Sequence, residues 1–146
     1  MKTRGKSKPL GKAKFHPISS LADDGISQVT KSYRKQVAGR YQAVTEDNIG
    51  MVLVHPPFHV SPKVDGELWF LVAEPDEAPA LCSPNGRVIT GSLPLLEEAA
   101  EMLGKPKERI ILAGELYVLA TEGRPRVGMV SSMLADGKNA EVERLG

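Results

Sequence analysis

The stretch at residues 80–91, "ALCSPNGRVITG", constrains the fold of this chain more than any other part of it. Two short runs rich in strand-forming residues lie on either side of Asn85-Gly86. Asn-Gly is the dipeptide that best suits a tight hairpin turn, because the central residues of such a turn need positive φ angles. We therefore predict two antiparallel strands joined at Asn85-Gly86.

Three further apolar runs predict strands. They are "MVLVH", "ELWFLVAEP" and "RIILAGELYVLA", and the last is the strongest. After it, "EGRPR" is expected to turn the chain back toward "VGMVSSML", while the tail "DGKNAEVERLG" has no clear apolar face and is expected to fray.

Two segments have the period of a helix. The first covers roughly residues 26–44, with Ser20 or Asp24 as its N-cap. Its apolar residues recur at intervals of three and four: Ile26, Val29, Tyr33, Val37, Tyr41 and Val44. The second is "LPLLEEAAEMLGK", which Gly104 ends. A helix followed by antiparallel strands with one inserted helix predicts the α+β class.

Positive charge is concentrated at the start of the chain. The net charge of the 146 residues is +1, yet residues 1–40 hold ten Lys/Arg against two acids, and residues 41–146 hold nine against sixteen. Such an end suits contact with phosphates, and a solubilising tail explains it equally well. The first six cations have no aromatic residue between them, so base stacking is not expected there: Lys2, Arg4, Lys6, Lys8, Lys12 and Lys14.

Composition sets the remaining limits. Because residues 1–20 are rich in Lys, Gly, Pro and Ser, we predict a basic flexible arm over 1–22 and one folded domain over 23–146. No apolar run approaches the ~20 residues of a membrane span, so no membrane partner is expected and a cytoplasmic protein is the default. Cys82, the only cysteine, excludes an intramolecular disulfide.

The stretch "SPKVDGELWF" carries a lysine just before a buried strand, where a charge is costly unless it is solvated or useful. Lys63 can be a surface residue, a salt-bridge partner or a nucleophile, and a nucleophilic amine must lose its proton. Asp65 can orient it, and Gly66 lets a nucleotide or the backbone approach closely. Glu115, inside an apolar strand, can accept hydrogen bonds from ribose hydroxyls or help to hold a divalent cation.

Three of these segments resemble motifs of the covalent nucleotidyltransferases, which comprise ATP-dependent DNA ligases, RNA ligases and mRNA capping enzymes. "KVDGEL" looks like their Lys-x-Asp-Gly motif, "SPNGR" resembles their Ser-Arg-Asn-Gly turn, and "ILAGELYV" is similar to their Asp-Gly-Glu strand. The segments follow the family's order over roughly residues 55–130, with a helix between the second and third. The resemblance implies a ligase-type nucleotidyltransferase fold, which is ATP-grasp-like.

The resemblance also implies a function, that of a DNA ligase-like enzyme. Lys63 would attack the α-phosphate of ATP, release pyrophosphate and carry AMP as lysyl-AMP, with Mg²⁺ neutralising the phosphates. AMP would then pass to the 5′-phosphate of nicked or broken DNA, or of RNA. Ser61 would lie near adenine, Asp65 and Gly66 would shape the nucleotide pocket, and Glu115 would contact ribose or a bound metal.

Departures from the family pattern leave alternatives open. Leu68 stands where many DNA ligases have Arg, so an RNA ligase is an open alternative. Pro84 replaces an Arg of the second motif, and Ala113 replaces an Asp of the third. The family's subsequent motifs have no counterpart, so we expect residues 23–146 to be the N-terminal part of an adenylation domain. The alternative is a non-catalytic module that binds nucleic acid or a partner chain, and unpaired sheet edges allow a homodimer.

Overall fold

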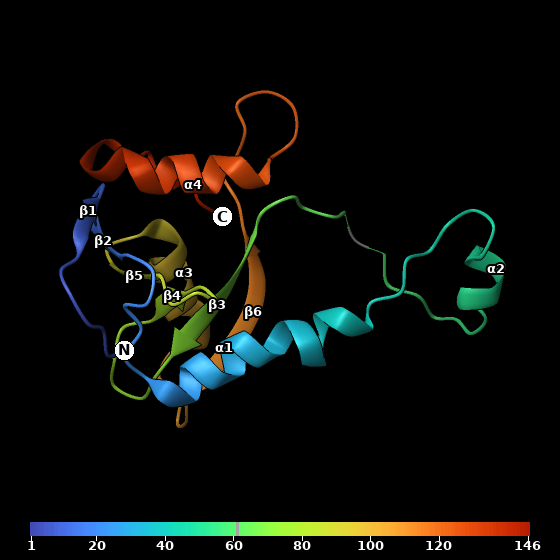
Figure 1. The fold of residues 1–146 in the computed structure, drawn as a ribbon, viewed down its shortest axis with the longest axis horizontal. Coiled ribbons are helices and arrows are strands. Elements are labelled where there is room, and N and C mark those ends of the chain that lie inside the picture. Colours follow the sequence, from blue (N-terminus) through green and yellow to red (C-terminus); the bar gives the residue numbers. More distant parts are fainter. Residues whose placement is uncertain (61) are drawn as a thin grey trace.

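The computed structural model describes every residue except Ser61, with Ala38 described by its backbone alone. In this described part an antiparallel sheet of six strands has helices on both faces, so the predicted α+β class is confirmed (Figure 1). The strand order is β1-β2-β5-β4-β3-β6. The strands are β1 (Lys8–Leu10), β2 (Ala13–His16), β3 (Glu67–Ala73), β4 (Ala80–Cys82), β5 (Val88–Gly91) and β6 (Ile110–Leu116). The helices are α1 (Asp24–Gln36), α2 (Ile49–Val52), α3 (Pro94–Leu103) and α4 (Val127–Asp136), with 3₁₀ turns at Ala38–Arg40, Gly137–Asn139 and Val142–Arg144. No helix in the described residues is both long enough and apolar enough to cross a bilayer.

The predicted hairpin forms the middle of the sheet. Strands β4 and β5 are antiparallel, with Cys82 opposite Val88, and Gly86 has the positive φ (+78°) that the turn requires. Strands β3 and β6 are also confirmed, and they pair over seven residues from Glu67↔Leu116 to Ala73↔Ile110. This long pairing holds the start of β3 beside the end of β6.

Alternation along the strands divides the core between the two faces of the sheet. On one face, Trp69 packs in a cluster with residues of α3 and α4, among them Leu96 and Val130. On the other face, Phe70 packs against Ile26 of α1. Trp69 and Phe70 are each only 1% exposed, and burying an aromatic side chain of this size stabilises the fold by roughly 2–3 kcal/mol.

The prediction of a basic flexible arm over residues 1–22 is wrong. These residues contribute β1 and β2, which pair with each other and, through β2, with β5. Leu10 and Ala13 are buried at 0% and 3% exposure, and Gly11 turns the chain between them with a φ of +55°. Lys8 and Lys14 of these short strands are exposed, so the basic composition hid the buried residues that lie between them. Residues 1–22 and the rest of the chain form one sheet.

Two segments near the C-terminus also differ from expectation. "VGMVSSML" is helix α4, because Val130, Met133 and Leu134 recur at helical spacing and are buried together. The tail is packed and does not fray: Val142 and Leu145 are buried in the same cluster, and the backbones of Tyr117 and Gly146 exchange two hydrogen bonds of 2.9 and 3.0 Å.

The segment from α1 to β3 departs from the prediction as well. Helix α1 ends at Gln36 and not near residue 44, and "MVLVH" forms no strand but overlaps the short helix α2, none of whose residues is buried. Figure 1 shows α2 at the far end of a long segment that leaves the sheet. Among the described residues, no neighbouring strand or core residue lies there to stabilise an extended strand. Exposed apolar side chains follow from this, including Tyr41 at 72% and Met51 at 75%.

The N-cap of α1 is Asp23 rather than Ser20 or Asp24. Its Oδ1 accepts a hydrogen bond of 3.0 Å from the Ile26 amide, and its Oδ2 lies 2.9 Å from Nη2 of Arg109. The bond from Ile26, followed by the charge of Arg109, holds the pKa of Asp23 below its ordinary value although burial opposes this.

We expect Asp23→Ala to lower the free energy of unfolding by about 1 kcal/mol at neutral pH, because α1 loses its cap. Since the folded-state pKa of Asp23 is depressed, the contribution is present above the ordinary pKa of 3.8 and is lost as the pH falls below it. Urea unfolding at pH 7 and pH 3 measures both values. Asp24→Ala, at an exposed first-turn position, is the control and should change stability by only about 0.3 kcal/mol; an equal loss in both variants would contradict the assignment of the cap.

Candidate functional site

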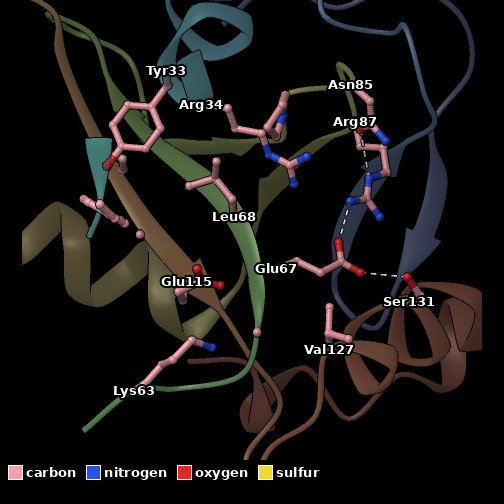
Figure 2. A pocket seen from close by; sticks show the side chains of 15 residues that line it. Tyr33, Arg34, Lys63, Glu67, Leu68, Asn85, Arg87, Glu115, Val127 and Ser131 are labelled. Atoms are coloured by element: carbon pink, nitrogen blue, oxygen red, sulfur yellow. Dashed lines mark hydrogen bonds and ion pairs between the residues drawn. The ribbon is translucent and has the colours of Figure 1, made fainter. Parts of the chain in front are cut away.

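A cavity of about 910 Å³ lies at the end of the sheet where β3 begins, β6 ends and the β4–β5 hairpin turns. We call it the main cavity. Side chains from α1, from the segment leading into β3, from the hairpin turn, from β6 and from α4 line it (Figure 2). Its charged lining residues are Arg34, Lys63, Glu67, Arg87 and Glu115.

The main cavity brings together residues from all three sequence motifs. Lys63 and Gly66 come from the first motif, Asn85 from the second and Glu115 from the third. The β3–β6 register causes this convergence, because it places Glu115 opposite Leu68, two residues after Gly66. Figure 2 shows Lys63 and Glu115 to one side of the start of β3, with Glu67 to the other.

Lys63 lies at the mouth of the main cavity and is open to solvent. Its side chain is 87% exposed, and its Nζ is 3.9 Å from Oδ1 of Asp65, which is 60% exposed. An ion pair so long and so exposed contributes little to stability. Asp65 thus accompanies Lys63 without lining the cavity, and Ser61, predicted to lie near adenine, is outside the described residues.

Gly66 is required by a close approach of two backbones. A Cβ at this position would overlap the carbonyl oxygen of Leu116 and lie 3.0 Å from the carbonyl carbon and 3.2 Å from Cβ of Tyr117. The sequence predicted that Gly66 lets either a nucleotide or the backbone approach closely. In the structure it is the backbone of β6 that approaches.

An ion pair that sequence reasoning missed forms one wall of the main cavity. Nη2 of Arg87 lies 2.5 Å from Oε2 of Glu67, and Ser131 Oγ donates to Oε1 of Glu67 at 2.7 Å. The Arg87 guanidinium also stacks 4.9 Å above the ring of Trp69, whose Nε1 donates to Glu67 at 3.3 Å. Both charged side chains are less than one-fifth exposed, so this pair joins the start of β3, β5 and α4 into one unit (Figure 2).

The environment of Glu67 favours its ionised form. Burial alone would raise its pKa, but the hydrogen bonds from Ser131 and Arg87, the charge of Arg87 and the bond from Trp69 outweigh burial and lower the pKa. Glu67 is therefore a carboxylate whose oxygens are already occupied, and it is poorly suited to hold a metal.

The hairpin turn orients Arg87 from below. Ser83 Oγ donates to Oδ1 of Asn85 at 2.5 Å, and Nε of Arg87 donates to the same Asn85 oxygen at 3.2 Å. The Arg87 amide donates to Ser83 Oγ at 3.1 Å. Ser83, Asn85 and Arg87 of "SPNGR" thus hold one another in place. Their close spacing in the sequence is the local signal from which a positioned Arg87 could have been predicted.

Helix α1 supplies the opposite wall of the main cavity. Tyr33 packs edge-on against Phe70, with ring centroids 5.4 Å apart and an interplanar angle of 85°. A side-chain hydrogen bond with Tyr41, together with burial, raises the pKa of Tyr33, which therefore stays neutral. Once Arg87 and Glu67 are paired, the charged residues left in the lining are Arg34, Lys63 and Glu115. The cavity therefore has an excess of positive charge, which suits an anionic ligand.

The main cavity is of the size that a nucleotide needs, since small-molecule sites measure roughly 300–1,000 Å³. Its free carboxylate is Glu115, with Asp65 nearby at the mouth. The described residues contain no group of three or more His, Cys, Asp or Glu side chains placed to hold a metal ion. Glu115 and Asp65 are too few to hold Mg²⁺ by themselves. They suit an Mg²⁺ ion that also has the phosphates of a nucleotide as ligands, which is how this ion usually binds.

Cys82 takes no part in the site. It is 0% exposed in β4, and burial, followed by the charge of Asp23, raises the pKa of its thiol to about 12. A protonated, buried thiol is a packing residue rather than a nucleophile.

Comparison of the chain with protein-family models, with curated proteins and with solved structures finds no match. The residues around the main cavity are therefore the basis on which a function can be proposed.

Proposed function

We propose that this protein performs ATP-dependent nucleotidyl transfer of the polynucleotide-ligase type, with Lys63 as the nucleophile. The observation that carries the proposal is the convergence of three separate segments on one cavity, which Lys63, Asn85 and Glu115 line together. Lysine, a hairpin polar group and a strand carboxylate are the parts that the resemblance to DNA and RNA ligases requires. An adenylation domain of the ligase type is the fold that accompanies this function.

The proposed chemistry is a displacement at phosphorus. The neutral amine of Lys63 attacks the α-phosphate of ATP, a P–N bond forms, the bond from the α-phosphorus to the bridging oxygen breaks, and pyrophosphate leaves. One proton leaves the ammonium group before the attack and a second leaves the nitrogen as the P–N bond forms, and the exposure of Lys63 lets both pass to solvent. Mg²⁺ bound with the nucleotide supplies charge neutralisation.

Other residues of the main cavity have positioning roles in this proposal. Arg34 lies on the α1 wall and can attract the phosphate chain toward Lys63, whereas Arg87 on the opposite wall is already paired with Glu67 and keeps that wall in place. Glu115 accepts hydrogen bonds from the ribose hydroxyls. AMP then passes from Lys63 to a 5′-phosphate of DNA or RNA, and Leu68, in place of an Arg, leaves the choice between the two open.

Labelling with ATP tests the proposal. With Mg²⁺ present, the protein should retain radiolabel from the α-phosphate through denaturation and none from the γ-phosphate. Lys63→Ala should reduce the retained label to background, because the nucleophile is gone, whereas Lys105→Ala, an exposed lysine after α3, should label like the unmodified protein. Absence of label from the unmodified protein, or equal label in Lys63→Ala, would contradict it.

The exposure of Lys63 favours one other candidate, a non-catalytic module that binds nucleic acid or a partner chain. Under that alternative Lys63→Ala leaves binding intact and no label is retained. The outer edge of β6 lies at the end of the described sheet, and pairing there with a second copy stays a prediction for this candidate.

A further inference from the structure

Six cationic side chains lie in β1, in β2 and in the segments that flank β1 at one end of the sheet. All six are exposed, and no ion pair joins any of them to a described residue. We call them the basic edge: Lys2, Arg4, Lys6, Lys8, Lys12 and Lys14. The pairing of β1 and β2 orders the backbone of Lys8, Lys12 and Lys14, and the backbones of Lys2 and Arg4 are hydrogen-bonded to Ala22 and Ser20. These charges therefore stand on ordered backbone rather than on a flexible tail.

A second cavity of about 350 Å³ is lined by Lys8 of the basic edge and by two residues of the main cavity. We call it the side cavity. Lys8 and Phe15 line it together with Arg87 and Ser131. Arg87 and Ser131 also line the main cavity, so the two cavities adjoin across this pair. No carboxylate lines the side cavity, and because Arg87 is paired with Glu67, the positive charge that it offers a ligand is that of Lys8.

Phe15 supplies the aromatic surface that the sequence alone did not associate with the basic cluster. It is directly opposite Lys8 in the β1–β2 register, so both side chains lie on one face of the sheet. Phe15 is partly exposed, although its inner side packs on the core cluster. An aromatic side chain beside unpaired cations is the combination that binds single-stranded nucleic acid, through base stacking and phosphate contacts.

We propose that a polynucleotide strand lies along the side cavity, with its phosphates on Lys8 and the neighbouring basic edge and a base against Phe15. The polynucleotide leads from the basic edge toward Lys63, and this direction rests on the proposed function. Binding of the polynucleotide does not rest on the proposed function, because it needs neither ATP nor Lys63. A partner protein is the poorer fit, since the basic edge presents six charges of one sign and no ion pair joins them to the described residues.

Fluorescence anisotropy of a labelled, 5′-phosphorylated single strand with the full chain tests this. Salt is varied over roughly 50–200 mM, and Lys8→Glu is compared with Lys107→Glu, which makes the same charge change in the loop before β6. Lys8→Glu should weaken binding by about tenfold at the lowest salt and reduce the slope of log K against log salt by about 0.7 or more. Lys107→Glu should stay within about twofold, since no phosphate contact is lost.

A second variant separates stacking from charge. Phe15→Leu keeps an apolar side chain in the core and should weaken binding by about fivefold with no change in the salt slope, because no charge is removed. Equal effects of Lys8→Glu and Lys107→Glu, no binding at the lowest salt, or equally tight binding of a polyglutamate chain of the same length would overturn the proposal. Deoxy and ribo strands of one sequence, run in parallel, identify which nucleic acid is preferred.

The same variants separate this inference from the proposed function. Lys8→Glu should retain full α-phosphate label, because Lys8 does not line the main cavity. Weakened strand binding by Lys8→Glu in a protein that takes no label would support the strand path and contradict adenylation. Normal strand binding by Lys8→Glu in a protein that does take label would contradict the strand path alone.

Discussion

Gly66→Ala is expected to lower the free energy of unfolding by about 2 kcal/mol, because the new methyl group overlaps the Leu116 carbonyl where β3 and β6 approach most closely. Relief of the overlap requires the start of β3 to move away from β6. Lys63, three residues before Gly66, should move with the start of β3 while Glu115 stays on β6, so the main cavity should widen. We therefore expect α-phosphate label to fall at least tenfold, which corresponds to about 1.4 kcal/mol of lost positioning. Urea unfolding and labelling measure the two effects.

Gly114 provides the matched control, since it is on β6 opposite Trp69 and a Cβ there would meet nothing within 4 Å. Gly114→Ala should leave stability unchanged or raise it by about 0.5 kcal/mol, because alanine restricts the unfolded chain. Equal behaviour of the two variants would contradict the claim that close packing of β3 on β6 shapes the site.

Arg87→Met is expected to lower the free energy of unfolding by about 3 kcal/mol at pH 7. The Glu67 carboxylate, only 13% exposed, then lacks its cationic partner, and the loss of one partner of a buried pair costs about 3–5 kcal/mol. The cation–π contact with Trp69 is lost as well. Burial opposes ionisation of Glu67, but its hydrogen bonds and the charge of Arg87 lower its pKa in the folded state. The stability that the ionised pair contributes is therefore present above the ordinary pKa of 4.5 and is lost as the pH falls below it. The difference between variant and unmodified protein should therefore shrink between pH 7 and pH 3.

A double-mutant cycle isolates the pair. Glu67→Gln together with Arg87→Met removes both charges, and the double variant should recover about 1–2 kcal/mol relative to the sum of the single variants. Additive losses, or a deficit in Arg87→Met that does not change with pH, would show that Glu67 and Arg87 contribute independently.

The elements that the sequence predicted well are those with strong local signals. Asn85-Gly86 specifies a hairpin turn by its backbone preferences alone, and the long apolar runs of β3 and β6 favour strands wherever they pack. Strands β1 and β2 have only three and four residues, too few for alternation to emerge from a lysine-rich background. Their conformation is set by β5, which lies more than 70 residues further along the chain, so local reasoning could not find it.

The candidate site divides in the same way. Lys63 and Gly66 stand out just before an apolar strand and Glu115 stands out inside one, and the structure brings the three residues to one cavity. The contact of Glu67 with Ser131 joins residues 64 positions apart, and it depends on α4 being a helix, which the sequence did not indicate. Phe15 was overlooked because its neighbour Lys8 is brought to it by a turn in a segment predicted to be flexible.

The identity of the residue that carries AMP tests the central claim most directly. After incubation with ATP and Mg²⁺, the intact mass of the protein should rise by one AMP, and peptide mapping by tandem mass spectrometry should place the added AMP on Lys63. A mass that does not change, or an AMP found on any other residue, would contradict the account.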